Sequence, residues 1–279
     1  MSAPRSLELP AGVESMRVET DRGSFAAHVS RPSEPTAHVL LVPGWTGSKE
    51  DFTPIVALLG DAGFAATAYD QRGQFETPGA PGDDYSLRAL AEDALAVATA
   101  VTDSPVHLLG HSFGGLVAQT AAVEAPAAWR SLSLLCTGPA ALGETDLHPL
   151  AKMVEALDHL PLERVHELRE QARPPGERPP AEIADFLHRR FTSNTPASLR
   201  AMTRHLLDAP DRVEEVARTG LPVWVGRGVD DDAWPHDRQA DMAHRLGVEV
   251  HVVPGSAHSP AVENPEELVA VWVPFLEGV

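Results

Sequence analysis

The chain has 279 residues, of which 43% are hydrophobic, so it is long enough to bury a sizeable core in one large α/β domain or two small ones. The formal net charge of -18 disfavours nucleic acid as a partner, because a polyanion is repelled unless basic residues cluster, and no run of Lys and Arg is present. The single cysteine, Cys136, excludes an internal disulfide. The first residues lack a secretory signal pattern and no apolar run is long enough for a membrane span, so we expect a cytoplasmic protein.

The first predicted element is an antiparallel hairpin, because apolar and polar residues alternate over residues 16–18 and 25–29, on either side of a turn at 21–23. After residue 38 the pattern changes to short, nearly continuous apolar runs, which strands buried on both faces require. These runs are HVLLVPG (38–44), FAATAYD (64–70), VHLLGHS (106–112), SLSLLCT (131–137), PVWVGRG (222–228) and VEVHVVPG (248–255). With the hairpin they predict an α/β fold, a mostly parallel eight-stranded sheet with helices on both faces.

One interval interrupts the alternation of strands and helices. About eighty residues separate the strand that ends near Thr137 from the strand that begins near Pro222, more than one crossover connection needs. Apolar residues recur there at helical spacing, as at Ile183, Phe186 and Leu187. We therefore predict a core domain built from residues 1–138 and 218–279, with a helical lid inserted over residues 139–217.

The stretch Gly110-His111-Ser112-Phe113-Gly114 has the G-x-S-x-G pattern, at the point where a predicted buried strand gives way to a helix. The glycines let the backbone turn sharply and let the helix pass close to neighbouring strands. The serine hydroxyl then lies at a helix N-terminus, where free N–H groups and the helix dipole favour a developing negative charge. This context predicts that Ser112 is a nucleophile rather than an ordinary serine in a Gly-rich connection.

A serine hydroxyl needs a base to become a nucleophile, and the chain offers 13 histidines. His258 follows the last predicted strand, on a loop of the kind that carries active-site residues at the carboxyl ends of parallel strands. The adjacent His111 is expected to pack away from the serine hydroxyl. We therefore predict that His258 is the base.

Taken together, these motifs resemble those of the α/β-hydrolase family, whose catalytic residues run serine, acid, histidine in chain order. The resemblance covers nearly the whole chain. It implies an acid on the loop after the penultimate strand, in a pattern like G-x-x-D-x-x-x-P, and alignment of that pattern on Gly228 and Pro235 selects Asp231. A shift of one residue would select Asp230 instead.

The resemblance also implies two backbone N–H donors for the oxyanion of the reaction. One belongs to Phe113, the residue after the nucleophile, and the other to Trp45, in the loop after an early strand. Pro43 departs from the His-Gly found at this loop in many relatives, but the donor is a backbone amide. The sequence has no metal-ligand spacing and no nucleotide-binding glycine loop, so neither a metal nor a cofactor is predicted.

The predicted function is that of a serine hydrolase of the carboxylesterase or lactonase type, acting on a small-molecule ester with an apolar portion through an acyl-enzyme. The same residues also serve hydrolysis of thioesters and of carbon–carbon bonds, and the fold also serves non-catalytic receptors for small molecules. Dehalogenases and epoxide hydrolases are disfavoured, because those relatives have aspartate where Ser112 stands. The sequence predicts no particular oligomeric state.

Overall fold

The computed structural model describes residues 2–142, 149–174, 176 and 178–279. In these residues it contains an eight-stranded sheet in the order β1-β2-β4-β3-β5-β6-β7-β8. The strands are β1 (Val13–Thr20), β2 (Gly23–Ser30), β3 (His38–Val42), β4 (Ala65–Tyr69), β5 (Val106–His111), β6 (Trp129–Leu135), β7 (Val223–Gly228) and β8 (Val250–Val253). The predicted eight-stranded sheet is confirmed.

The two N-terminal strands run against the rest of the sheet. β1 pairs antiparallel with β2, and β2 pairs antiparallel with β4. From β4 to β8 the neighbouring strands pair in parallel. β4 and β5 are buried along their whole length, as strands covered by helices on both faces must be. Because parallel strands end at one edge, the loops that follow β3, β5, β7 and β8 come together there.

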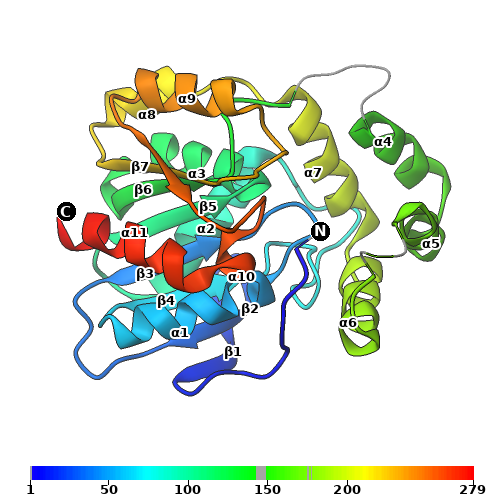
Figure 1. The fold of residues 1–279 in the computed structure, drawn as a ribbon, viewed down its shortest axis with the longest axis horizontal. Coiled ribbons are helices and arrows are strands. Elements are labelled where there is room, and N and C mark those ends of the chain that lie inside the picture. The colour runs from blue at the N-terminus through cyan, green and yellow to red at the C-terminus, as the bar shows by residue number, and fades with distance from the viewer. Residues whose placement is uncertain (1, 143–148, 175, 177) are drawn as a thin grey trace.

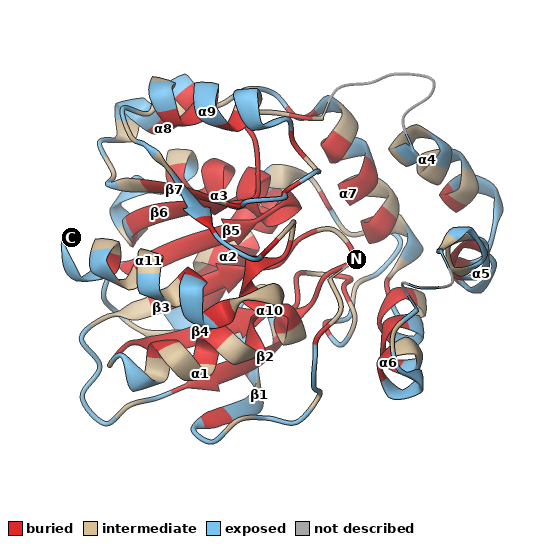
Figure 2. Ribbon diagram, viewed as in Figure 1, coloured by how far each residue is buried: buried red, intermediate tan, exposed pale blue. Residues whose placement is uncertain are grey.

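Helices cover both faces of the sheet (Figure 1). One face is covered by α1 (Thr53–Asp61), the short α10 (Pro260–Glu263) and α11 (Pro265–Glu277), and the other by α2 (Leu87–Val101), α3 (Phe113–Glu124), α8 (Val213–Thr219) and α9 (His236–Arg245). Single 3₁₀ turns are formed by η1 (Lys49–Phe52) and η2 (Pro126–Ala128). Figure 2 shows the buried residues gathered on the sheet and on the helix faces turned towards it. The apolar core therefore forms two layers, one on each side of the sheet.

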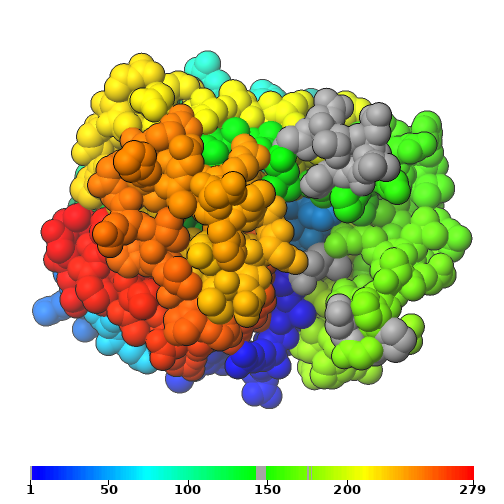
Figure 3. Space-filling model, turned by 45° about the horizontal axis from the view of Figure 1, so that its top comes forward, coloured from blue at the N-terminus to red at the C-terminus, as the bar shows by residue number. Residues whose placement is uncertain are grey.

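The long interval between β6 and β7 is helical. It contains α4 (Pro149–His159), α5 (Leu162–Ala172), α6 (Ala181–Thr192), α7 (Pro196–Asp208) and α8. α4 packs against α7 and α5 against α6, beyond the edge of the sheet where β5 ends, whereas α8 packs against α3 of the main body (Figure 1). In the space-filling view the green residues of this segment lie beside orange residues of the C-terminal part, with dark blue N-terminal residues at the boundary (Figure 3). The division into a core and a lid stays a prediction.

A buried ion pair joins the helical segment to the main body. Arg190 of α6 is fully buried and donates to the carboxylate of Asp51 in η1 over 2.7 Å. The same guanidinium donates to the backbone carbonyl of Ser2 over 2.6 Å. Since an unpaired buried charge is strongly unfavourable, this pair restricts how α6 can sit on the body. None of the helices in the described part of the chain combines the length and apolar character of a membrane span.

The turn between β5 and α3 depends on two close backbone approaches. Ser112 at its apex has φ 55° and ψ -122°, a conformation that residues other than glycine rarely adopt. A Cβ atom on Gly110 would lie 2.2 Å from the carbonyl oxygen of Gly114. A Cβ atom on Gly114 would lie 2.2 Å from the carbonyl oxygen of Val42 in β3. Both positions therefore require glycine, for the reason the sequence pattern predicts.

The Gly114→Ala substitution should lower the free energy of unfolding by about 1–3 kcal/mol, because backbone atoms of β3 or α3 must shift to admit the methyl group. Chemical denaturation measures the change. Gly82→Ala is the matched control, since Gly82 lies in an exposed turn where a Cβ atom would meet nothing within 4 Å. An equal loss in the two variants would contradict this account of the turn.

Three histidines are buried within the sheet: His28 in β2, and His107 and His111 in β5. Burial, which disfavours the charged imidazolium, lowers the pKa of each to about 4. In the unfolded chain a histidine titrates near 6.5. Between about pH 6.5 and about pH 4 the unfolded chain therefore binds protons that the folded chain does not, and these groups make stability fall as the pH is lowered.

The His107→Gln substitution should make the free energy of unfolding less dependent on pH in this window, by about 1.4 kcal/mol per pH unit, because one proton fewer is taken up on unfolding. Denaturant titrations across this pH range measure the slope. His244→Gln is the comparison variant, because it removes a histidine that lies on the exposed side of α9. An unaltered slope in His107→Gln would show that burial does not keep this imidazole neutral.

Candidate active site

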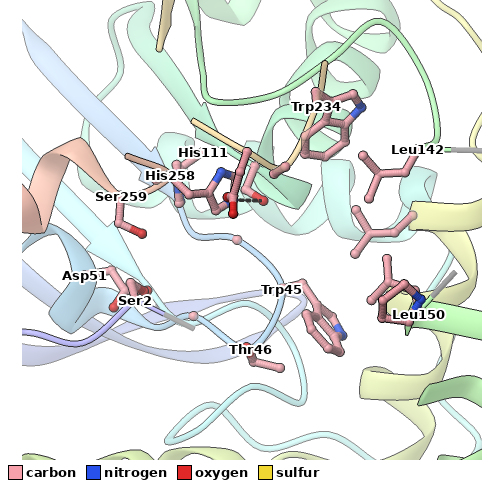
Figure 4. A pocket seen from close by; sticks show the side chains of 17 residues that line it. Ser2, Trp45, Thr46, Asp51, His111, Leu142, Leu150, Trp234, His258 and Ser259 are labelled. Carbon is pink, nitrogen blue, oxygen red and sulfur yellow. Dashed lines mark hydrogen bonds between the residues drawn. The ribbon is translucent and has the colours of Figure 1, made fainter. Parts of the chain in front are cut away.

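Ser112 lies at the end of β5, where its side chain is 7% exposed. Its Oγ atom is 2.9 Å from Nε2 of His258, which lies on the loop between β8 and α10 (dashed line, Figure 4). The two residues are 146 positions apart in the sequence. The edge where the parallel strands end therefore brings the predicted nucleophile and the predicted base into hydrogen-bonding contact.

On the other side of its ring, His258 Nδ1 donates to Oδ1 of Asp231 over 2.7 Å. Asp231 follows β7 and is 4% exposed, whereas Asp230 and Asp232 on either side of it are exposed. With Nδ1 donating to a carboxylate, a neutral imidazole presents Nε2 as an acceptor to the hydroxyl of Ser112. Of the two aspartates left open by the sequence, the structure places Asp231 against the histidine.

The carboxylate of Asp231 is held on both oxygens. Gln239 of α9 donates from Nε2 to Oδ2 over 2.7 Å, and the backbone N–H of Ala233 donates to Oδ1 over 3.2 Å. Burial alone would raise the pKa of Asp231, but the hydrogen bonds from His258, Gln239 and Ala233 and the charge of His258 outweigh burial and lower this pKa below its usual value. The carboxylate is therefore ionised at neutral pH although it is buried.

Two further side chains hold the loop that carries His258. His111 Nε2 donates to the backbone carbonyl of His258 over 2.6 Å, and Glu263 accepts the backbone N–H of Ala257 over 2.5 Å. The sequence pattern gives His111 a packing role and assigns no contact to Glu263 or Gln239. These contacts join separate segments, so no local sequence motif predicts them. They position the imidazole between Ser112 and Asp231.

The two predicted oxyanion donors flank Ser112. Phe113 is the first residue of α3, where a helix leaves its N–H groups without intrahelical partners. Trp45 follows Gly44, and a Cβ atom on Gly44 would lie 3.1 Å from Cβ of Ser112. Neither backbone N–H donates to another residue in the described part of the chain. Both are therefore available to a ligand, and their role as oxyanion donors stays a prediction.

A pocket of about 320 Å³ opens onto Ser112 and His258. Figure 4 shows its two sides: the side chains of Trp45, Leu142, Leu150 and Trp234 gather on one side, and those of Ser2, Thr46, Asp51 and Ser259 lie on the other. The apolar side includes residues of the helical segment, namely Leu150 of α4 and Leu206 of α7. The pocket thus offers a hydroxyl and an imidazole, with apolar surface beside them.

Within the described residues, His111, Cys136 and His258 bring possible metal-ligand atoms within 4.8 Å of one another. Both ring nitrogens of His258 are already hydrogen-bonded, to Ser112 and to Asp231. Burial, together with the charge of Asp231, raises the pKa of the Cys136 thiol well above its usual value, which disfavours the thiolate that binds metals. The contacts of this cluster therefore fit hydrogen bonding better than metal binding.

Residues 33–265 match the family described as serine aminopeptidase, S33. The pimeloyl-acyl-carrier-protein methyl ester esterase of Neisseria meningitidis serogroup A is 30% identical, over 95% of this chain and 82% of that protein. A candidate carbamate hydrolase of Variovorax paradoxus is 37% identical over 97 residues, only 35% of this chain and 36% of that protein.

Solved structures share the fold. A thermophilic esterase from Thermogutta terrifontis superposes with a TM-score of 0.76 at 20% identity, over 95% of this chain and 98% of the other. An N-acyl homoserine lactonase superposes with a TM-score of 0.75 at 22% identity, over 95% and 97% of the two chains. The fold of these proteins, together with the match over residues 33–265, shows that the chain belongs to the serine aminopeptidase S33 family of α/β hydrolases.

Proposed function

We propose that the protein is a serine hydrolase that cleaves carboxylic esters, lactones included, through an acyl-enzyme on Ser112. The observation that carries the proposal is the hydrogen-bonded series from Ser112 Oγ to His258 Nε2, at 2.9 Å, and from His258 Nδ1 to Asp231 Oδ1, at 2.7 Å. A hydroxyl, an imidazole and a buried carboxylate in this order are the groups that acyl transfer by a serine requires. Membership of a hydrolase family and the resemblance to an esterase agree with it.

In the first half of the reaction, His258 Nε2 removes the proton of Ser112 as Oγ attacks the carbonyl carbon of the ester. The tetrahedral intermediate collapses when His258 returns that proton to the leaving alkoxide, which departs as an alcohol. Water then attacks the acyl-serine with His258 again as base, and the carboxylic acid is released. The ionised Asp231 stabilises the imidazolium that forms in both halves, and its contact with Gln239 holds it in place.

The negative charge on the carbonyl oxygen needs donors that are already in position. We assign this role to the backbone N–H groups of Trp45 and Phe113, which have no other acceptor among the described residues. Neither group depends on its own side chain, so the indole of Trp45 is free to contact the substrate. It lines the pocket and is fixed by a hydrogen bond of 2.9 Å from Nε1 to Oγ1 of Thr203 in α7.

The helices between β6 and β7 act as a lid in this proposal. Leu150 and Leu206 come from that segment and line the same pocket as Ser112 and His258, so the segment covers part of the substrate. Apolar side chains at this position favour an apolar portion beside the ester bond. Hydrolysis of a thioester or of a carbon–carbon bond would use the same catalytic residues, and the identity of the substrate is what distinguishes these reactions.

The Ser112→Ala variant should lose at least about 1,000-fold in kcat on p-nitrophenyl esters and lactones, because the acyl-enzyme cannot form. A panel of p-nitrophenyl esters, from acetate to long acyl chains, measures this loss. A fluorophosphonate probe should label the wild type and Ser104→Ala, whose serine lies on an exposed loop, but not Ser112→Ala. Absence of labelling in the folded wild type would favour a non-catalytic small-molecule receptor.

The Asp231→Asn variant should retain the fold but lower kcat by roughly 1,000-fold to 10,000-fold, because the amide no longer holds the imidazole as a carboxylate does. Asp230→Asn is the matched control: this neighbouring carboxylate is exposed, so its loss should leave kcat within about two-fold. Steady-state kinetics on one activated ester compare the two. Comparable losses of kcat in the two variants would contradict the assignment of Asp231 as the acid that holds His258.

A further inference from the structure

A second cavity, of about 480 Å³, lies between the helices α4 and α5. It shares Trp45, Pro149 and Leu150 with the pocket at Ser112, so the two cavities meet at these side chains. Apart from two cations its lining is apolar, with Met153, Ala156, Val165, Leu168 and Ala172 on its walls. An extended substrate that leaves the first pocket past Trp45 therefore enters an apolar space.

The two cations of this lining are Lys152 and Arg169, and no acidic residue lines the cavity with them. The guanidinium of Arg169 lies over the rings of Trp45 and Phe191, 5.1 Å from each ring centroid. Such cation–π contacts fix the position of the group without supplying an oxygen to accept from its N–H donors. The residue is therefore held rigidly at the wall of the cavity.

The guanidinium of Arg169 has no hydrogen bond or ion pair to another described residue, and its Nη1 atom is buried without a partner. The carboxylate of Glu170, the next residue in the chain, accepts from Arg173 over 2.9 Å. A partly buried cation without an acid is unfavourable, and it stands out in a chain that has 40 acidic residues. An anionic ligand would supply the missing partner.

Arg169 stays charged at neutral pH. Burial lowers its pKa and the carboxylate of Glu170 opposes that effect, while the charges of Arg173 and Arg190 add to it, which leaves the pKa at about 10. A guanidinium that is protonated at pH 7 and has no ion-paired acid among the described residues attracts anions.

We propose that this cavity receives the far end of the acyl chain of the substrate and that Arg169 binds a carboxylate at that end. The inference rests on the proposed function, which places the ester carbonyl at Ser112. The planar fork of one arginine matches a single carboxylate, and the otherwise apolar walls match a methylene chain. The substrates are thus half esters of long straight-chain dicarboxylic acids.

The test uses p-nitrophenyl half esters of dicarboxylic acids of increasing chain length, each compared with the p-nitrophenyl ester of the monocarboxylic acid of the same length. For the wild type, the ratio of kcat/KM between the two classes should peak at one chain length, because the distance from Ser112 to Arg169 is set by the fold. At that length Arg169→Gln should raise KM for the half ester about 10-fold to 100-fold and leave the neutral ester unchanged. Arg169→Lys should recover part of the preference.

Arg164→Gln is the control on the same helix, since Arg164 is exposed and pairs with Glu167. It should leave both ester classes unchanged. An equal loss on both classes in Arg169→Gln would mean that this arginine only packs against Trp45 and would overturn the assignment. If Arg169→Gln does not fold, the wild-type series still tests the assignment. A ratio of kcat/KM between half ester and neutral ester that shows no preference at any chain length would overturn it. Failure of the wild type to hydrolyse either class would overturn the proposed function as well.

Discussion

The structure depends on the close passage of α3 across the carboxyl ends of β3 and β5. Without side-chain atoms at Gly110 and Gly114, the first turn of the helix lies against the backbone of both strands, and Ser112 takes a positive φ at the apex. Such backbone strain persists only where many surrounding contacts hold the residue in that conformation. Once this turn is in place, the loops after β3, β7 and β8 have one common edge at which to meet the serine.

Buried charges near that edge are paired with groups of the opposite charge or with hydrogen-bond donors. Asp231 keeps its carboxylate because His258, Gln239 and the backbone of Ala233 all donate to it. Arg190 is buried because it meets Asp51. Arg169 differs from these groups, since aromatic rings hold its guanidinium and no acid among the described residues forms an ion pair with it. A cation without an ion-pair partner at the wall of an apolar cavity is the basis for the proposed anionic ligand.

Trp45 connects the chemistry at the sheet edge with the helical segment. Its backbone is next to Gly44, which lies against Ser112, while its indole donates to Thr203 and supports Arg169. The residue lines both cavities, so the loop after β3 takes part in each of them. In the proposed reaction, the backbone of this loop meets the carbonyl oxygen and its indole meets the rest of the substrate.

The sequence by itself determined the strands, because each buried parallel strand is a continuous apolar run, and it singled out Ser112 and His258, because a nucleophile turn and a loop after the last strand are local patterns. It left two candidates for the acid. Only the tertiary structure decided that Asp231 meets His258, since backbone direction after β7 turns one aspartate inward and its neighbours outward. Contacts between distant segments, such as those of Gln239 and Arg169, leave no trace in local sequence, because they arise only when the helices pack.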